Sequence, residues 1–376
     1  MFPLISILFA LYVSGSACAT GEPPAIGNEK PMPHIALLLP LKSAAFRSSA
    51  KAVQQGFLAA NLDRPNPGKL NPVTQAPPEE LPVRVYGCAD ESKDIVALYR
   101  LAIANGARAV VGPLTRNGVS ALAAAQDFPV PTLTLNAAED IPAGQLYFFG
   151  MATETEARQV AQLARQQHLR RAVVITTRAQ LDKRLQSAFE DEWNSSGGAI
   201  LREIEFHDDP EVFADISDMP DAAIFLAADA EKARLIRPYL PNKLPIYATS
   251  QIFAGNDDTL TNYDLNGIRF VDMPWLLQAD HPAVMAYPRA DPPLPADLER
   301  LYALGIDAFR LIHLLLAGKV DAALPLDGVS GDIQLHGHAF QRAAIPAVFI
   351  QGQAQLRETQ TAPPPQVFPD KPAGKP

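Results

Sequence analysis

Hydrophobic residues occur along this chain in short runs of strand length, and several of these runs lead into amphipathic segments. The first run begins at His34 and turns through Pro40 and Lys42 into a predicted helix. Residues 109–112 repeat the arrangement, with a Gly-Pro turn and a predicted helix that begins near Thr115. This order of strand, turn and helix is typical of parallel βαβ units, whose loop-to-helix junctions share one edge of a sheet.

The same alternation continues along the chain and predicts two α/β lobes of similar build. Thr153 and Glu156 predict a capping box at the first helix of the second lobe. The predicted strands are 83–86, 109–112, 131–135, 147–149, 172–176, 200–206, 222–226, 245–248, 328–335 and 347–351, and the predicted helices are 92–105, 116–126, 153–167, 180–195 and 297–316. We therefore expect two mainly parallel sheets flanked by helices, with crossovers near residues 150, 275 and 325, as in two-lobed periplasmic binding proteins.

Composition separates the folded lobes from flanking segments. Residues 20–33 and 359–376 are rich in Pro and polar residues, which predicts an extended tether and a disordered tail. The remaining residues are assigned as lobe I, 34–149 with 276–325, and lobe II, 150–275 with 326–358.

The N-terminal residues predict export. Residues 1–19 form an apolar segment too short to span a bilayer, and the segment ends in small residues. Ser16-Ala17-Cys18 resembles the end of a lipobox, which would acylate Cys18 and anchor the chain to a membrane. Ordinary cleavage after Ala19 is the alternative, and it would release the chain into the periplasm.

Charge and cysteine content narrow the class of protein. The 376 residues include 32 basic and 41 acidic side chains, and no local run of Lys or Arg is present, so nucleic acid is not an expected partner. The length and a hydrophobic content of 48% allow two lobes with separate cores. Cys88 has no partner once a signal is removed, which predicts an inert buried thiol and stability from core burial alone.

Several strings together resemble one known family. They are IALLLPL with QQGFLAA, ALYRLAIANGARAVVGPLTRNGVSAL, PTLTLN, ATSQIF, LNGIRFVDMPWLL, RLYALGIDAFRL and GVSGDIQL, between residues 34 and 352. In order and spacing they resemble the LppC-type lipoproteins, the LpoA-type penicillin-binding protein activators. The resemblance implies a type 1 periplasmic-binding-protein fold and an outer-membrane lipoprotein that stimulates a bifunctional peptidoglycan synthase from the periplasm without catalysing a reaction. Fuller members carry a helical-repeat domain ahead of this one, whereas a predicted signal and tether precede His34 here.

Candidate ligand-binding residues gather where predicted strands end. A helix N-terminus and an Arg fork are suited to a small carboxylate, so the candidate residues of lobe I could bind one in the cleft. In lobe I these residues are Lys42, Ser43, Thr115, Arg116, Asn136 and Ala137, and in lobe II they are Thr153, Ser250, Gln251 and Trp275. The alternatives stay open: Ser43 could cap its helix, Arg116 could be a solvated charge, and Trp275 could be a core aromatic.

The sequence contains little that indicates a catalytic, metal or cofactor site. The seven histidines are scattered, and the chain has no HExxH, GxSxG, P-loop or GxGxxG motif, so we expect no metal, no cofactor and no enzyme. The predicted function is a non-enzymatic activator that binds a bifunctional penicillin-binding protein. The alternative is a solute-binding protein that delivers an amino acid or similar anion to an ABC transporter, but Leu114 and Leu135 stand where such a cleft needs polar groups.

Overall fold

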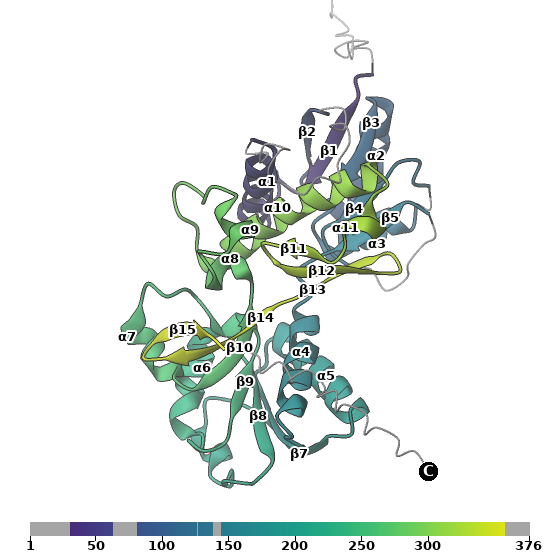
Figure 1. Cartoon of the computed structure of the whole chain (residues 1–376). Coiled ribbons are helices and arrows are strands. Elements are labelled where there is room, and N and C mark those ends of the chain that lie inside the picture. The colour runs from purple at the N-terminus through teal and green to yellow at the C-terminus, as the bar shows by residue number, and fades with distance from the viewer. Residues whose placement is uncertain (1–30, 63–80, 126, 138–143, 358–376) are drawn as a thin grey trace, which may run out of the picture.

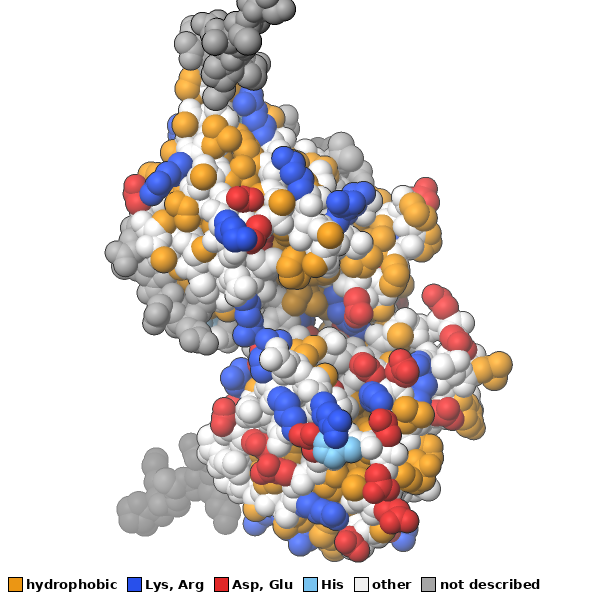
Figure 2. Space-filling view, turned by 180° about the vertical axis from the view of Figure 1, so that it is seen from behind, with side chains coloured by type: hydrophobic (Ala, Val, Ile, Leu, Met, Phe, Trp, Pro, Cys, Tyr) orange, Lys and Arg blue, Asp and Glu red, His pale blue; other side chains and the backbone are white. Residues whose placement is uncertain are grey.

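The computed structural model describes residues 31–62, 81–125, 127–137 and 144–357, which form two α/β lobes. The lobes lie one above the other in Figure 1, and Figure 2 shows them meeting at a narrow waist. The predicted signal with Cys18, the predicted tail and most of the predicted tether lie outside the described residues.

Lobe I is built on the first sheet, in which eight described strands follow an order that mixes early and late parts of the chain. The order is β11 (Leu326–Gly328), β12 (Gly331–His336), β13 (Ala339–Ala343), β5 (Leu146–Phe149), β4 (Thr132–Thr134), β3 (Ala107–Val111), β1 (His34–Leu39) and β2 (Val83–Gly87). The pairs from β13 to β2 are parallel, and β12 is antiparallel to both of its neighbours, β11 and β13.

Lobe II is built on the second sheet, which repeats this mixed, mainly parallel design. Among the described residues its order is β15 (Gln353–Leu356), β14 (Ile345–Ile350), β10 (Ile268–Asp272), β9 (Ile246–Ala248), β8 (Ala222–Ala227), β6 (Arg171–Thr176) and β7 (Ala199–Glu205). Among the described strands of this sheet, the pairs β10–β14 and β14–β15 are antiparallel and the other pairs are parallel. The predicted fold class, two mainly parallel sheets flanked by helices, is confirmed.

Helices cover both faces of each sheet. The α-helices are α1 (Arg47–Leu62), α2 (Glu91–Ala104), α3 (Arg116–Ala123), α4 (Thr153–Gln166), α5 (Gln180–Ser195), α6 (Ala230–Ile236), α7 (Thr259–Asn262), α8 (Pro274–Leu277), α9 (Pro282–Met285), α10 (Ala296–Leu316) and α11 (Val320–Ala323). Short 3₁₀ helices are η1 (Pro210–Phe213), η2 (Arg237–Tyr239), η3 (Ser250–Ile252) and η4 (Tyr263–Leu265).

Strand β1 shows why an uninterrupted apolar run forms the centre of lobe I. Alternate side chains of a strand point to opposite faces. Ile35 and Leu37 pack with α1 and α10, whereas Ala36 and Leu38 pack with α2 and α3. Because both faces are covered, every position of the strand is buried and must be compatible with the core. Lobe II is built in the same way, with α4 and α5 on one face of its sheet and α6 on the other.

Helices α1 and α10 approach each other closely because two glycines lie at their contact. A Cβ atom on Gly56 would meet the backbone carbonyl of Tyr302, and one on Gly305 would meet that of Val53. The absence of side chains at both positions lets the two backbones touch. This contact joins the first helix of lobe I to the late helix that precedes β11.

The chain crosses between the lobes three times. The first two crossings, 149–153 and 272–274, agree with the predicted positions near 150 and 275. The third lies at 343–345, between β13 and β14, and not near 325. The assignment of residues 326–343 to lobe II was therefore wrong.

The late third crossing is stabilised by the packing of Ile333 and Phe340 in the core of lobe I and by a buried carboxylate on α10. Asp307 accepts hydrogen bonds from Val329 N at 3.2 Å, from Ser330 N at 2.8 Å and from Ser330 Oγ at 2.6 Å. These bonds hold the turn between β11 and β12 against lobe I. Consequently β11, β12 and β13 extend the first sheet before the chain leaves it.

Two further observations concern burial and hydropathy. Cys88 is a buried free thiol, as predicted, and burial raises its pKa to about 11, with Glu91 and Asp94 adding to the effect. Within the described ranges no helix has both the length and the apolar character that a membrane span requires.

Candidate functional site

A cavity of about 760 Å³ opens between the lobes at the ends of the first strands of lobe I. Four of the predicted residues line it: Ser43, Thr115, Arg116 and Asn136. Leu114, Leu135, Met151 and Leu301 supply apolar lining, and Arg184 reaches the cavity from α5 of lobe II. The strand-end junctions are therefore brought together, as parallel βαβ units require.

The junction between β3 and α3 is occupied by a carboxylate of the chain itself. Glu91, in the first turn of α2, accepts hydrogen bonds from Leu114 N at 3.0 Å and from Thr115 N at 2.7 Å. Its side chain is buried at the edge of the cavity. Burial raises the pKa of Glu91, and the hydrogen bonds from Leu114 and Thr115 oppose that shift. The N–H groups that could bind a ligand carboxylate are thus already paired.

The neighbouring groups of this junction are also paired within the chain. Thr115 is the N-cap of α3, and its Oγ1 accepts from Gly118 N at 3.2 Å. Gly118 leaves space for Glu91, because a Cβ atom there would lie 2.7 Å from the Glu91 Cβ. Asn136 Nδ2 donates to Leu114 O at 3.1 Å, and Asn136 Oδ1 accepts from Ala137 N at 3.0 Å.

Arg116 contacts a carboxylate from the other lobe. Its Nη2 donates to Glu154 Oε1 at 2.6 Å, and the same oxygen lies 3.2 Å from Arg184 Nε. Glu154 belongs to α4, so this three-residue contact joins the lobes at the mouth of the cavity. The fork that was predicted to clamp a ligand carboxylate holds the chain's own carboxylate here.

The remaining predicted residues of lobe I do not form the expected site beside a helix N-terminus. Lys42 and Ala137 are exposed and do not line the cavity. Helix α1 begins at Arg47, so Ser43 is neither its N-cap nor next to its free N–H groups. The carbonyl of Ser43 accepts from Arg47 N at 3.1 Å.

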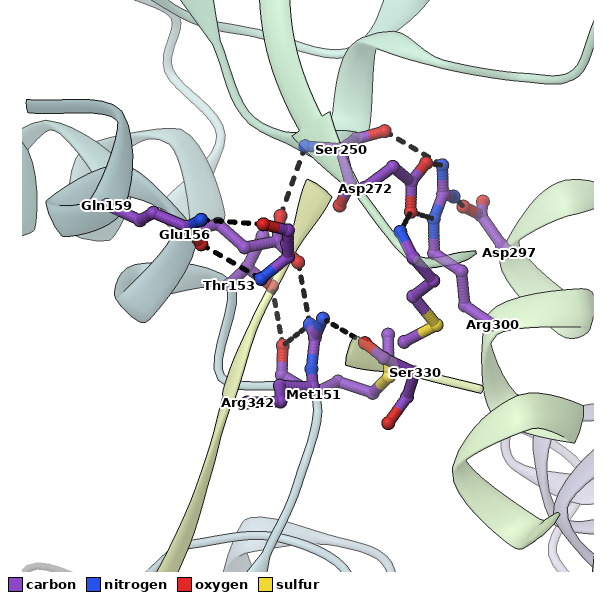
Figure 3. Close-up of polar contacts among 12 residues, drawn as sticks. Met151, Thr153, Glu156, Gln159, Ser250, Asp272, Asp297, Arg300, Ser330 and Arg342 are labelled. Atoms are coloured by element: carbon purple, nitrogen blue, oxygen red, sulfur yellow. Dashed lines mark hydrogen bonds and ion pairs between the residues drawn. The ribbon is translucent and has the colours of Figure 1, made fainter. Parts of the chain in front are cut away.

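The predicted capping box at α4 is wrong. The N-cap of α4 is Ala152, and Thr153 Oγ1 donates to Met151 O at 3.4 Å. Glu156 accepts hydrogen bonds from Arg342 Nη2 at 2.6 Å and from Ser250 N at 3.1 Å, and Figure 3 draws both contacts. The physical reason is that a buried guanidinium without a partner costs more free energy than an exposed helix end, whose N–H groups water can solvate.

A second buried guanidinium joins the lobes at the middle crossing. Arg300 of α10 donates to both carboxylate oxygens of Asp272, at 3.1 and 2.6 Å. It also donates to Ser250 O at 2.9 Å and Phe253 O at 2.7 Å, both in lobe II. Figure 3 shows Ser250 placed between this network and Glu156. Ser250 is buried there, so it does not face a ligand in the cavity, and Gln251 does not line the cavity either.

Trp275 belongs to the core. It is fully buried, stacks on Tyr302, and donates from Nε1 to Glu299 Oε2 at 2.5 Å. The guanidinium of Arg289 lies 3.9 Å from the centre of its ring. The prediction that this indole closes over a ligand is therefore wrong, and the alternative of a core aromatic describes its position.

The third crossing is held by one glutamine. Gln159 Nε2 donates to Ala344 O at 2.7 Å, and Ala344 N donates to Gln159 Oε1 at 3.0 Å. This pair fixes the residue between β13 and β14 against α4.

Among the described residues, no group of three or more His, Cys, Asp or Glu side chains is placed to hold a metal ion.

The comparisons with known proteins agree with the fold and with the predicted resemblance. The family model described as LppC, a provisionally assigned lipoprotein, matches residues 27–219 and 214–342. The chain belongs to this family. Its fold is the type 1 periplasmic-binding-protein fold, which solved structures of transporter-type binding proteins share.

Relatives of this LppC-family chain carry two different descriptions. The penicillin-binding protein activator LpoA from Haemophilus influenzae is 28% identical over 308 residues, which cover 79% of this chain and 50% of the relative. The solved C-domain of LpoA from the same organism, described as a regulator of PBP1A, has 25% identity and a TM-score of 0.67, covering 86% of this chain and all of that domain. A structure from Chromobacterium violaceum, provisionally described as a branched-chain amino acid ABC transporter, has 34% identity and a TM-score of 0.69, covering 85% and 100%. This chain spans about half the length of the curated relatives that it matches.

Residues that decide the character of the cavity were missed in the sequence. Glu91 follows Asp90 at the start of α2, where acidic residues ordinarily complement the helix dipole. Glu154 holds a similar place at the start of α4. No local signal distinguishes a carboxylate that stays at its own helix from one that reaches a distant N–H group or guanidinium.

The raised pKa of Glu91 predicts a pH-dependent contribution to stability. The folded chain binds this proton more tightly than the unfolded chain, so the free energy of unfolding should fall as pH rises from the ordinary glutamate value of about 4.3 to the raised value. Glu91→Gln should show a shallower decrease in that window. Urea unfolding at a series of pH values measures the slope, and exposed Glu231→Gln is the control. Equal slopes for wild type and Glu91→Gln would contradict the assignment.

Proposed function

We propose that this LppC-family chain is a non-enzymatic periplasmic activator of a bifunctional penicillin-binding protein and acts by protein–protein binding. The observation that carries the proposal is that the groups of the β3–α3 junction that could bind a ligand carboxylate are paired with carboxylates of the chain itself. Glu91 takes the N–H groups of Leu114 and Thr115, and Glu154 takes Arg116. A free amino acid entering this cavity would therefore compete with two internal carboxylates.

The contacts at the crossings support the same proposal. A solute receptor closes its lobes by a hinge motion around the ligand. Here Arg300 with Asp272, and Arg342 with Glu156, are buried ion pairs that link the lobes next to the crossings. Separating either pair during a hinge motion would leave buried charges without partners, which is costly. These contacts favour one fixed arrangement of the lobes.

The second candidate is a solute-binding protein for an amino acid or similar small anion. It is favoured by the 34% identity to the Chromobacterium violaceum structure, whose full length is covered. In that case Glu91 would have to leave the β3–α3 junction when the ligand binds. The two candidates therefore differ in whether wild-type chain binds small carboxylates.

One pair of assays separates these candidates. The purified chain without its predicted signal is added to a peptidoglycan polymerisation and crosslinking assay with the bifunctional synthase of the same organism, and its melting temperature is measured with single amino acids. We expect stimulated synthesis and no amino-acid shift. No stimulation together with a clear amino-acid shift would overturn the proposal in favour of the solute-binding protein.

The variant Glu91→Ala tests whether the Glu91 carboxylate keeps a small carboxylate from binding at the β3–α3 junction. Removing the side chain frees the N–H groups of Leu114 and Thr115 and leaves space for the two carbons and two oxygens of acetate. Acetate should raise the melting temperature of Glu91→Ala and leave that of wild type unchanged. An acetate shift of equal size in both chains would show that Glu91 does not block the junction.

For localisation, we propose that acylation of Cys18 anchors the chain to the outer membrane from the periplasmic side. The lipoprotein family and the sequence before Cys18 support this assignment. Labelling cells with an alkyne analogue of palmitate should mark wild type and not Cys18→Ser. Unlabelled wild type would instead support cleavage after Ala19.

A further inference from the structure

A second groove separates the lobes where α4 faces the hairpin of β12 and β13. It consists of two connected hollows of about 480 and 440 Å³, which share Gln159, Gln162, Asp332 and Ala343. Figure 1 shows β12 and β13 above α4 at this place. Among the described residues, none lines both this groove and the cavity of the candidate site. We call it the α4 groove.

Both walls of the α4 groove are polar because of the periodicity of their elements. Residues three and four positions apart share one side of a helix, and alternate residues share one face of a strand. The stripe on α4 includes Thr155, Gln159, Gln162 and Gln166. The face of the hairpin consists of Asp332, Gln334, His336, Gln341 and Ala343. Gln334 lies directly opposite Gln341 in the pairing of β12 with β13.

Most amide side chains in this groove are free to bind a ligand. Those of Gln166, Gln278, Gln334 and Gln341 form no hydrogen bond with another described residue. An amide places donors and an acceptor side by side, so it suits groups that also donate and accept. Hydroxyl groups and acetamido groups have this property.

Gln159 shows how an amide of this groove pairs with another amide. Its Nε2 donates to Ala344 O at 2.7 Å, and its Oε1 accepts from Ala344 N at 3.0 Å, as Figure 3 draws. An acetamido group offers the same combination of N–H and C=O. The free amides nearby can therefore bind it with two hydrogen bonds each.

The charges in the groove favour an uncharged ligand. Arg342 is paired with Glu156, which leaves Arg158 beside Asp327 and Asp332. A polyanion or a polycation would meet charges of its own sign here, which is unfavourable. A chain without charge avoids this cost.

A peptide would find few of the contacts that it needs in this groove. Strands β12, β13 and β14 each have a partner strand on both sides, so none of them has an edge to which a strand can be added. Apolar lining is confined to one end, at Leu163, Pro274, Ile345 and Pro346, whereas protein interfaces have an apolar centre. The C–H face of a sugar ring can pack on this short apolar strip.

We propose that the α4 groove binds an uncharged chain of N-acetylated sugars, and that the source of this chain is the glycan strand made by the bifunctional synthase. The source rests on the proposed function. The stripe from Thr155 to Gln166 extends over about 16 Å, because a helix rises about 1.5 Å per residue. This length suits a chain of sugars better than a single sugar. A bound strand would contact both lobes beside the third crossing.

The test uses tetra-N-acetylchitotetraose, an uncharged oligomer of N-acetylglucosamine, in isothermal titration calorimetry. We expect wild type to bind it and Gln334→Ala/Gln341→Ala to bind it at least tenfold more weakly. The melting temperature should not change, because both side chains are exposed. Gln353→Ala/Gln355→Ala replaces two exposed glutamines of β15 that do not line the groove, so this control should bind as wild type does.

Further titrations identify the chemistry of the ligand. Binding of the oligomer should change little between low and high salt, because no charge is neutralised. Cellotetraose, which lacks acetamido groups, should bind more weakly. A strong dependence on salt, equal binding of cellotetraose, or tighter binding of tetraalanine than of the sugar would overturn the inference.

Sedimentation with insoluble peptidoglycan tests the source of the chain. Wild type should sediment with it, and Gln334→Ala/Gln341→Ala should stay in solution. Binding of the oligomer without sedimentation would overturn the glycan strand as the source. A wild type that stimulates the synthase but binds neither the oligomer nor peptidoglycan would overturn this inference and leave the proposed function standing. A wild type that binds both without stimulating the synthase would overturn the proposed function and leave carbohydrate binding by the groove standing.

Discussion

Replacing Arg300 with alanine is expected to lower the free energy of unfolding by about 3–5 kcal/mol, because it leaves Asp272 as an unpaired charge in a fully buried position. The guanidinium also supplies the hydrogen bonds to Ser250 O and Phe253 O, so two buried carbonyl groups lose a donor as well. Urea unfolding at neutral pH measures the change. Since Arg300 joins α10 to lobe II, this variant should also loosen the contact between the lobes.

Another carboxylate partner of Arg300 provides the control. Asp297 binds Arg300 Nη1 at 2.7 Å, but its carboxylate is largely exposed. Asp297→Ala should cost less than about 1 kcal/mol, because water replaces the lost contact. Comparable small losses in Arg300→Ala and Asp297→Ala would mean that the buried pair does not hold the lobes together.

Adding one methyl group at Gly305 is the second change with a large expected effect. In an isolated helix, glycine to alanine stabilises by about 1 kcal/mol. Here the new methyl would meet Val53 O and lie 2.8 Å from Phe57 N, and both are backbone atoms that cannot turn aside. We expect Gly305→Ala to lower the free energy of unfolding by about 3 kcal/mol, at the upper end of the usual cost of overpacking a core.

Gln55→Ala is the matched control, because Gln55 lies on the exposed side of α1 next to Gly56. That variant should be neutral or slightly stabilising, since alanine is a better helix former. Chemical denaturation of both variants measures the difference. A stabilised Gly305→Ala would show that α1 and α10 are farther apart than the structure places them.

Much of each lobe could be predicted from local pattern. The run Ile35–Leu39 is apolar at every position, which predicts a strand buried on both faces, and both faces of β1 are covered. Asp90 and Asn105-Gly106 bracket α2 with a start and a stop that act over one helical turn. Periodicity and caps are local properties, so they can be recognised without knowing the rest of the chain.

The partners of the buried charges could not be predicted in the same way. Glu156 was expected to cap its own helix, yet it pairs with Arg342, which is 186 positions away in the sequence. Glu91 and Arg116 similarly find partners on other elements. Each of these side chains had a plausible local role, and only the assembled fold brought the competing partner within reach.

The sequence by itself determined the class of the fold, the two lobes, the first two crossings and the strand-end cavity, because these follow from hydrophobic periodicity and from the geometry of parallel βαβ units. The tertiary structure decided where the third crossing lies, which carboxylates pair with the groups at the cavity, and which side chains link the lobes. These features depend on which polar groups become buried together, since a buried charge takes the nearest partner that the fold brings to it. Asp307 of α10 illustrates this point, because it holds Ser330 and thereby keeps β11, β12 and β13 in lobe I.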